Sequence, residues 1–534
     1  MSKIITHATF VLLGPLSVSV AAQLPVPCAT GACGVTGPQT WVTSGAANLV
    51  QVGNLLTITQ SSENAVLNWR SFNVSADGTV TFKQPDAAAV ALNQIFQADP
   101  SKILGALNAN GSVYLINQNG IIFGAGAQVN THSLIASSLN ITPAAVNGIL
   151  NAGLNDEPAF SSFVDASGNP LISGPVQVDS GAKITAPGGE IMLFAPQVTN
   201  QGSLRADGGQ VILAAGDSVY LAASTDPNLR GLLVEVGHGG TVTNAAASSL
   251  GGTNAGQISA NDGNVSMVGL IVNQLGRISA TTAVQQNGSI YLLAQDGGSA
   301  SAQQGAVAAT LTATHAGTLN LGTGSQTDVT LDLASKSVAV DETAQPKSQV
   351  TLVGQQVSLL GGSEITATSG NVSITASAVP GQSADNFAAQ PGTGRLVIFD
   401  GASIDVAGAN ISLPVSSNVI PVQLRGTELA DSPVQRTGPL YGQTVYIDTR
   451  QSGVRPDGSA WVGSPIGDLS GYVSAVQRDV AERSLTGGSI ALNSDGAVFV
   501  APKANLNISG GSINYQSGYV NTTKLLGTNG EVYD

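Results

Sequence analysis

The sequence of 534 residues is poor in charge, in aromatic side chains and in sulfur. Charged residues make up 10% of the chain and aromatic residues 4%, and there are only three methionines, three tryptophans and two cysteines. A charged fraction well below the usual quarter is atypical of a cytosolic enzyme, while a hydrophobic fraction of 42% excludes a disordered chain. The chain therefore folds with unusually little charged surface.

Positive charge is the scarcer sign. Nineteen lysines and arginines oppose 33 acidic residues, which gives a formal net charge of -14. This balance, with no basic run, argues against nucleic acid and anionic membranes as partners. The histidines lie too far apart for helix-type metal spacing, at His7, His132, His238 and His315. We expect no nucleic-acid partner, no cofactor and no metal.

A broken apolar run lies at the N-terminus. Residues 8–20 follow a short segment that carries Lys3, and the small residues Val20 and Ala22 precede Gln23. The run is shorter than the roughly 20 apolar residues that span a membrane. The pattern predicts a secretory signal peptide over residues 1–22, and a mature chain that leaves the cytoplasm. Two closely spaced cysteines, Cys28 and Cys33, suit an oxidising compartment.

Glycine, by contrast, is abundant, with 65 residues. From about residue 40 onward, short apolar runs alternate with clusters of Gly, Asn, Asp and Ser, which is the pattern of strands and turns. A Gly-Gly pair opens an apolar run at 188–193 and again at 208–213, and a longer unit at 198–206 recurs at 272–280. A coil that cannot bury its own inner face must stack on the next coil. The period of about 20 to 25 residues therefore predicts a parallel β-helix.

We expect an all-β chain folded as a right-handed parallel β-helix, a solenoid with an N-terminal cap and loop insertions. At a strand spacing of about 4.8 Å, the mature chain would form roughly 20 to 24 coils and a rod on the order of 100 Å long. A β-propeller or tandem β-sandwiches would show periods of about 40 to 100 residues and more aromatic anchors. Neither signature is visible in the sequence.

Two segments interrupt the rhythm of the coils. One is a loop around residues 380–391, and the other is residues 413–485, where Arg, Asp and Glu become more frequent. Apolar residues among charged ones predict a short helix over 473–485. We expect 413–485 to be an insertion on the flank of the rod, between filament coils at 291–412 and further coils at 486–534. The last coils stop without a polar cap, so we expect the chain to be part of a longer exoprotein.

The densest motif lies in residues 107–130, where two Asn-rich turns flank an apolar run. With residues 68–73 upstream and 134–139 downstream, it resembles the secretion domain, or haemagglutination activity domain, of filamentous haemagglutinin-type exoproteins of the two-partner secretion pathway. We assign residues 23–290 to this domain. The family usually has proline where this chain has Gln118. The motif residues are Asn108, Asn110, Gly111, Asn117, Asn119, Gly120 and Ile121.

The resemblance implies export by a dedicated outer-membrane transporter β-barrel that recognises the unfolded chain, followed by folding outside the cell. The protein would then be secreted or lie on the cell surface. The motif residues would serve secretion either as stacked turns or by contact with the transporter, and both roles remain open. We also expect Cys28 and Cys33 to close one small loop at the N-terminal cap.

We interpret the chain as an adhesin without enzymatic activity. Outward Ser, Thr, Asn and Gln on long walls suit many weak contacts with host or neighbour cell-surface glycans or proteins. The main alternative is a β-helix enzyme that degrades polysaccharides, for which the candidates would be Asp405, Asp448 or Asp457 with Arg450 or Arg455. Another is the N-terminal part of a haem-acquisition or contact-dependent inhibition exoprotein, although scarce Met and His disfavour haem ligation here.

Overall fold

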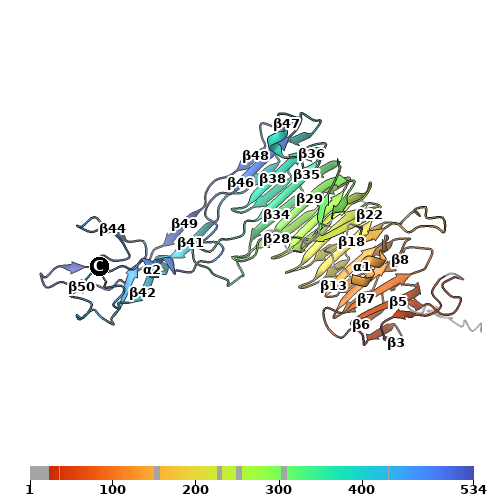
Figure 1. The fold of residues 1–534 in the computed structure, drawn as a ribbon, viewed down its shortest axis with the longest axis horizontal. Coiled ribbons are helices and arrows are strands. Elements are labelled where there is room, and N and C mark those ends of the chain that lie inside the picture. Colours follow the sequence, from red (N-terminus) through yellow and green to blue (C-terminus); the bar gives the residue numbers. More distant parts are fainter. Residues whose placement is uncertain are drawn as a thin grey trace, which may run out of the picture.

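The fold is a rod of stacked coils with one lobe projecting from its side (Figure 1). The computed structural model describes residues 23–34, 37–148, 157–224, 231–247, 255–301, 309–430 and 432–533. The predicted signal peptide, residues 1–22, lies outside the described residues. Among the residues described, no helix combines the length and the apolar character needed to cross a membrane.

A complete coil contributes one strand to each of three sheets in turn; the coil that begins with β5 lacks the strand of the second sheet. The coil that begins with β18 continues through β19 and β20, and β21 then stacks on β18 twenty positions further on. The first sheet has 14 strands, of which β1, β2 and β32 pair antiparallel with their neighbours and 11 stack in parallel. Its strands are β1 (Val26–Pro27), β2 (Val42–Ser44), β5 (Asn64–Ser71), β7 (Val90–Ile95), β10 (Ser112–Ile116), β13 (Ser133–Ser137), β18 (Glu190–Ala195), β21 (Gln210–Ala215), β26 (Asn264–Gly269), β29 (Ser289–Asp296), β32 (His315–Ala316), β35 (Gln349–Gly354), β38 (Asn371–Ala376) and β46 (Ser489–Ser494).

The other two sheets complete the walls of the rod. The second sheet, with 10 strands, consists of β8 (Ser101–Ile103), β11 (Ile121–Phe123), β16 (Val176–Val178), β19 (Gln197–Asn200), β24 (Thr241–Asn244), β27 (Ile271–Gln274), β33 (Thr318–Leu321), β36 (Gln356–Leu359), β39 (Arg395–Ile398) and β47 (Ala497–Val500). The third sheet, with 13 strands, consists of β3 (Ala47–Val52), β4 (Leu55–Gln60), β6 (Thr79–Lys83), β9 (Ala106–Ala109), β12 (Gln128–Asn130), β17 (Lys183–Thr185), β20 (Ser203–Arg205), β25 (Gln257–Ala260), β28 (Arg277–Thr282), β34 (Gln326–Leu331), β37 (Glu364–Ala367), β40 (Ser403–Asp405) and β48 (Asn505–Asn507).

The core runs down the inside of the rod. Alternate side chains of each strand point inward, and parallel pairing in register places apolar residues of successive coils above one another. One such column in the first sheet runs through Ile191, Val211, Val265, Ile290 and Val350. All five are fully buried. The predicted all-β parallel β-helix is confirmed.

The predicted number of coils was wrong. Eleven parallel strands in the first sheet correspond to a rod of about 50 Å at 4.8 Å per strand, half the expected length. The difference arises because long excursions leave the rod between successive coils. The interval between β21 and β26 includes β22 and β23, and the interval between β38 and β46 includes residues 377–488.

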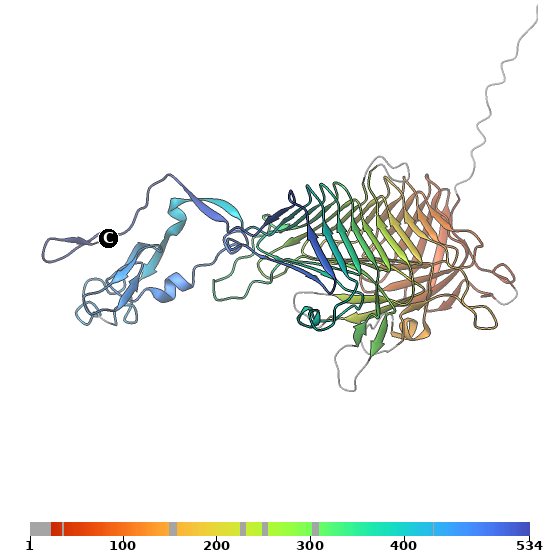
Figure 2. The same cartoon turned by 90° about the horizontal axis from the view of Figure 1, so that it is seen from above.

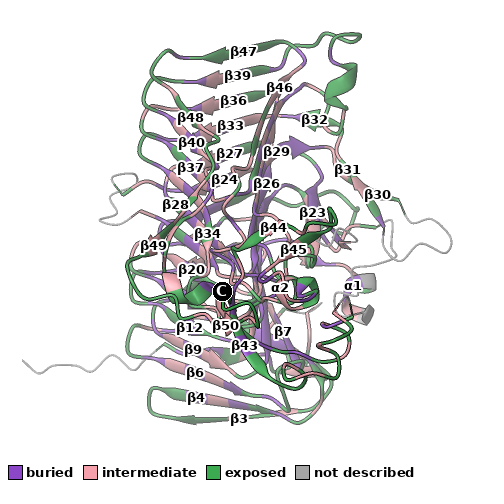
Figure 3. Ribbon diagram, turned by 90° about the vertical axis from the view of Figure 1, so that its left-hand side faces the viewer, coloured by how far each residue is buried: buried purple, intermediate pink, exposed green. Residues whose placement is uncertain are grey.

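The excursions cover the outer face of the first sheet over its N-terminal half. A four-stranded antiparallel sheet and a short helix pack there: β14 (Asn140–Ile141), β15 (Phe160–Ser161), β22 (Ser218–Ala223), β23 (Leu232–Val236) and α1 (Pro143–Gly148). Phe160 from this cover contacts Phe194 of β18, with ring centroids 4.9 Å apart. A second hydrophobic cluster therefore lies outside the rod, and the strands beneath it are buried on both faces (Figure 3).

A separate lobe leaves the rod through a two-stranded ribbon of β41 (Asn410–Pro414) and β49 (Ser512–Gln516) (Figure 2). Residues 419–474, here called the lobe, have their own small core around Val422, Leu429 and Leu469. Their elements are β42 (Val419–Gln423), β43 (Thr444–Asp448), β44 (Ser452–Val454), β45 (Ala460–Val462) and α2 (Ser470–Ser474). Smaller elements elsewhere are β30 (Ser299–Ser301), β31 (Thr310–Thr312), η2 (Ala384–Asn386), η3 (Val415–Asn418), β50 (Leu525–Leu526) and β51 (Val532–Tyr533).

The helix predicted over residues 473–485 was wrong. The only helical turn there belongs to α2, and the residues after it form turns, irregular backbone and one isolated bridge between Arg478 and Ala339. Tertiary contacts override the helical pattern, because Val480 packs against Val284 and Ala339 from other parts of the chain. The guanidinium of Arg483 also donates to the backbone carbonyl of Val340 at 2.5 Å.

Candidate functional site

The two Asn-rich turns lie at successive corners of one stretch of the rod. The first turn connects β9 of the third sheet to β10 of the first sheet, and the second connects β10 to β11 of the second sheet. Both are therefore stacked on turns of neighbouring coils. Backbone groups at such corners are not paired by the sheets, so side chains must satisfy them.

The first turn is locked to the preceding coil by Asn110. Its Nδ2 donates to the carbonyl of Gln84 at 2.8 Å, and its Oδ1 accepts from the backbone N–H of Gln84, also at 2.8 Å. A Cβ at Gly111 would come within 2.8 Å of backbone carbonyl oxygens of the preceding coil. Asn108 is half-exposed at the third position of β9 and accepts one bond, 3.2 Å long, from Asn130 of the next coil.

The second turn is built around Asn117, whose side chain is fully buried. Its Nδ2 donates to Ser101 Oγ at 3.0 Å, and its Oδ1 accepts the backbone N–H of Asn119 at 3.0 Å. Gly120 has a φ of 102°, and a Cβ there would lie 2.4 Å from the carbonyl oxygen of Pro175. Ile121 then enters the core as the first residue of β11. The turn needs a small amide, a glycine and an apolar residue in this order.

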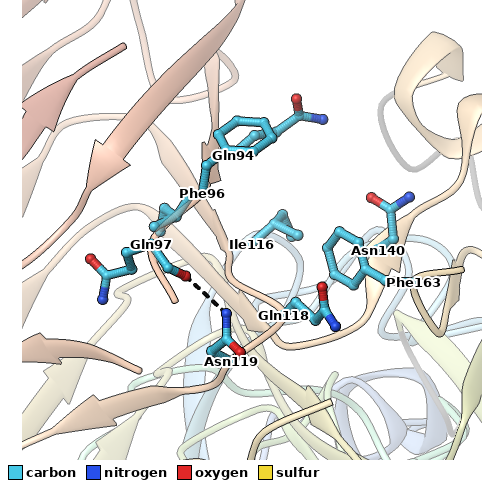
Figure 4. A pocket seen from close by; sticks show the side chains of 9 residues that line it. Gln94, Phe96, Gln97, Ile116, Gln118, Asn119, Asn140 and Phe163 are labelled. Carbon is cyan, nitrogen blue, oxygen red and sulfur yellow. Dashed lines mark hydrogen bonds between the residues drawn. The ribbon is translucent and has the colours of Figure 1, made fainter. Parts of the chain in front are cut away.

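A groove of about 400 Å³ opens beside the second turn (Figure 4). The side chain of Asn119 faces it and donates to the backbone carbonyl of Gln97 at 2.8 Å. Phe96 stands on its rim with 44% of its surface exposed, and Gln118 donates from the turn to the carbonyl of Ile172 at 3.3 Å. The groove is lined by Gln94, Ile95, Phe96, Gln97, Ile116, Gln118, Asn119, Asn140 and Phe163.

The N-terminal cap closes the end of the rod at β5. Cys28 and Cys33 form a disulfide there, with Cα atoms 5.7 Å apart. β1 pairs antiparallel with β5, and the indole rings of Trp41 and Trp69 meet edge to face at 5.6 Å. Trp69 Nε1 donates to Asn93 Oδ1 at 2.8 Å inside the rod.

The structure does not gather the acidic candidates of the enzyme alternative. Asp405 lies on β40 of the rod and accepts from Asn507 of the next coil at 3.1 Å. Asp448 lies in the lobe, where Arg450 donates to it at 2.6 Å; this bond lowers the pKa of Asp448 and keeps it ionised. Asp457 is an exposed turn residue that accepts the hydroxyl of Ser459, while Arg455 donates to backbone carbonyls. Of these five candidates, Asp448 and Arg450 meet as a close ion pair.

Sequence reasoning missed a ladder of buried amides inside the rod. Asn200 donates to Asn244 at 2.9 Å, and Asn244 donates to Gln274 at 2.8 Å, across three stacked coils. All three side chains are fully buried. The signal was present, because the repeat of 198–206 at 272–280 aligns Asn200 with Gln274.

A second missed residue is Glu235 on β23 of the cover. Burial raises the pKa of Glu235 to about 7, although a 2.6 Å hydrogen bond from Gln295 opposes the shift. A single acidic residue in an apolar strand carries no recognisable sequence signal, so only the packing of the cover reveals it. In the described part of the chain, no group of three metal-ligating side chains comes together.

The stacked corners and the three-sheet rod define a β-helical secretion domain. A model of the TPS secretion domain matches residues 34–309, more than half of the chain, so the chain belongs to this family. The family implies passage across the outer membrane through a dedicated transporter.

Two curated proteins match parts of the chain. The chain is 32% identical over 176 residues to the heme/hemopexin-binding protein of Haemophilus influenzae strain KW20/Rd. The matched segment is 33% of this chain and 18% of that protein. A second heme/hemopexin-binding protein from Haemophilus influenzae is 41% identical over 86 residues, 16% of this chain and 9% of that protein. The matches thus span less than a fifth of these relatives.

A solved structure shows the same fold. The secretion domain of HMW1 from Haemophilus influenzae superposes with a TM-score of 0.50 at 19% identity, covering 70% of this chain and 84% of that one.

Proposed function

We propose that the chain is the N-terminal part of a secreted adhesin, in which the secretion domain directs export and starts the β-helix, and the later coils and the lobe face the surroundings. The match to the TPS secretion domain family carries the export part of this proposal. The outward Ser, Thr, Asn and Gln of the coils that the cover leaves exposed support the adhesive part, because many weak contacts add up along a rod.

We further propose that the Asn-rich motif acts in folding rather than as a docking site for the transporter. The side chain of Asn110 bonds to Gln84 of the preceding coil. That of Asn117 bonds to Ser101 of the preceding coil and to the backbone of its own turn. Folding outside the cell would then retain the exported chain there, and a chain that cannot close these corners would stall.

Export of the full chain from a diderm bacterium, with and without the cognate transporter, tests both proposals. We expect folded, protease-resistant protein in the medium only with the transporter. Asn117→Ala should lower both secreted yield and stability, the latter by about 1–3 kcal/mol, because it leaves buried partners unsatisfied.

Asn108→Ala is the matched control within the motif, since its side chain makes one surface bond. We expect near-normal export. If Asn108→Ala abolishes export while stability is unchanged, the motif is read directly by the transporter. Escape of the wild-type chain without a transporter would contradict the export proposal itself.

A second candidate function is binding of haem or a haem carrier, which the names of the two relatives suggest. Titration of the purified chain with haem, followed by its Soret absorbance, and with haem-loaded hemopexin tests this candidate. Saturable binding of either ligand without binding to host cells would replace the adhesin proposal.

A further inference from the structure

The groove beside the second Asn-rich turn lies between the rod and its cover (Figure 4). Its floor comes from β7 and β10 of the first sheet, and its other lining residues come from the cover and from the turns at the ends of these strands. Its volume of about 400 Å³ is typical of small-molecule sites, which span roughly 300–1,000 Å³. Among the described residues, nine line the groove and none of them carries a charge. A charged ligand would therefore find no counter-charge in this lining.

Five amide side chains line the groove, and two of them maintain its shape. Gln97 is bonded at both ends, because its Oε1 accepts the backbone N–H of Phe72 and its Nε2 donates to the carbonyl of Asp99, each at 2.9 Å. Asn119 donates in turn to the carbonyl of Gln97. These two amides are used by the fold.

Gln94 and Asn140 are the amides that the fold leaves available. Both are half-buried, and within the described parts of the chain neither side chain makes a hydrogen bond. Gln118 uses its Nε2, which donates to the carbonyl of Ile172, and its Oε1 accepts no bond from the same described residues. In Figure 4 these three amides lie around the buried side chain of Ile116. Together they offer a ligand both donors and acceptors.

Two phenylalanine rings add apolar surface beside these amides. Phe96 stands exposed on the rim, and Phe163 packs against the hydrophobic cluster beneath the cover, which fixes that side of the groove. Aromatic surface beside a few polar groups suits a ligand with an apolar face and polar groups around its edge. A pyranose ring has this character, because its faces carry C–H groups and its edge carries hydroxyl groups.

An extended peptide matches this lining less well than a sugar does. Addition of a peptide strand needs a free strand edge, whose backbone groups bond to the incoming chain. β7 pairs with β5 and β10, and β10 pairs with β7 and β13, so the floor of the groove offers no free edge. The available polar groups are side-chain amides, which match hydroxyl groups that both donate and accept.

We infer that this groove binds a neutral pyranose sugar, with its hydroxyl groups on Gln94, Asn140 and Gln118 and its apolar ring face on Phe96. The inference gives a ligand class to the adhesive role, and in that respect it rests on the proposed function. The sugar would lie on the outside of the rod, where a glycan of a host or neighbour cell can reach it once the chain has folded.

Saturation-transfer NMR with the purified full chain tests this site. The probes are the neutral methyl pyranosides of glucose, galactose and mannose, and each is paired with its uronate, which differs by a carboxylate. We expect at least one neutral probe to bind at least about fivefold more tightly than its uronate, because the lining offers a carboxylate no counter-charge. The ring protons of this probe should receive more saturation than its methoxy protons, since one ring face lies on Phe96.

Variants locate the binding. Gln94→Ala, Asn140→Ala and Phe96→Ala should each weaken it by about threefold or more, because each removes a hydrogen bond or the aromatic contact. Gln197→Ala, on the outer face of β19, is the matched control for an amide, and Phe399→Ala is the control for an exposed ring. Both lie outside the groove and should leave the affinity unchanged. Protease resistance of each variant reports whether it has folded.

Equal binding of neutral probes and their uronates, or no saturation transfer to any neutral probe at millimolar concentration, would overturn the inference. So would unchanged affinity in either Gln94→Ala or Asn140→Ala, or binding of an uncharged, end-capped tetrapeptide in place of the sugars. A chain that is exported but binds none of the neutral probes refutes this inference alone. A chain that binds them but is not exported refutes the export proposal alone.

Discussion

The two halves of the first sheet differ in what lies on their outer face. Beneath the cover, β21 reads Gln-Val-Ile-Leu-Ala-Ala and all six residues are buried. Beyond the cover, β35 reads Gln-Val-Thr-Leu-Val-Gly and buried positions alternate with half-exposed ones. The inner face is apolar in both. The outer positions therefore record whether a coil is covered, and the same sheet passes from doubly buried to half-solvated along one rod.

A single outward column shows the transition residue by residue. It runs in register from Phe194 through Ala214, Val268, Leu293 and Val353 and reaches Thr375. The first three are fully buried in the cluster beneath the cover or beside it, whereas Thr375 is half-exposed. Position in the sheet is constant along this column, so the difference in burial comes from the cover.

The largest effect should come from breaking the covered end of this column. Phe194→Ala removes a fully buried ring that contacts Phe160 and should cost about 3–5 kcal/mol. Thr375→Ala, at the bare end of the same column, should change stability by less than about 0.5 kcal/mol. Native-state hydrogen exchange of β18 and β38 measures both. Equal costs would show that the cover adds no packing energy.

Asn244→Ala tests the contribution of the rod interior, in comparison with an amide on the outer face. The change leaves Asn200 and Gln274 without their buried partner and should cost about 2–3 kcal/mol. Asn273→Ala, which removes an outward amide bonded to Asn320 at 3.1 Å, is the control and should cost well under 1 kcal/mol. Urea unfolding followed by circular dichroism compares the two variants. A small loss of stability in Asn244→Ala would mean that water replaces the amide inside the rod.

The cover should respond to pH through Glu235. Because burial raises the folded-state pKa of Glu235 to about 7, above its unfolded value near 4.5, the folded form holds a proton that the unfolded form has lost. Its contribution is fully present below pH 4.5 and is lost as pH rises to about 7, by at most about 1.4 kcal/mol per pH unit. Glu235→Gln should remove this slope from hydrogen exchange of β23. Parallel pH profiles for the two proteins would contradict the assignment.

The smallest effect is expected on the bare face. Thr351→Val on β35 should shift stability by no more than about 0.5 kcal/mol, because the position is half-exposed. Ile212 lies in the same column of the sheet as Thr351, but in the covered half. Ile212→Thr should lower stability by more than about 1 kcal/mol, because it buries a hydroxyl under the cover. Thermal unfolding of the two variants side by side sharpens the comparison. A large loss in Thr351→Val would reveal an unrecognised contact on the bare face.

The sequence predicts the rod well because its signals are local. Gly-Gly corners and inward apolar residues repeat at 188–193 and 208–213, and the structure stacks these segments as β18 on β21. The number of coils could not be predicted in this way. Excursions such as β22–β23 are themselves apolar strands, and they read as further coils until their antiparallel pairing is seen.

The candidate site likewise has features that the sequence predicts and features that depend on tertiary packing. The motif turns could be found from their Asn and Gly residues, because each position has a local geometric need, such as the φ of 102° at Gly120. The groove beside them depends on Phe96, Asn140 and Phe163, which come from three segments and meet through packing. Composition marks residues 413–485 as unusual, but only tertiary packing gives the lobe its own core around Val422, Leu429 and Leu469.

The stacking of one coil on the next also decides how the rod bears load. Its strands run across the axis, so the hydrogen bonds between coils point along it, and tension between the two ends stretches these bonds in series. Interfaces in series carry the same tension, so the weakest one opens first and leaves an equivalent edge behind. A coil such as that from Glu190 to Gln210 would release about 70 Å of chain when it opens. If such a rod held a cell, it would lengthen in steps under tension and would not break at a single point.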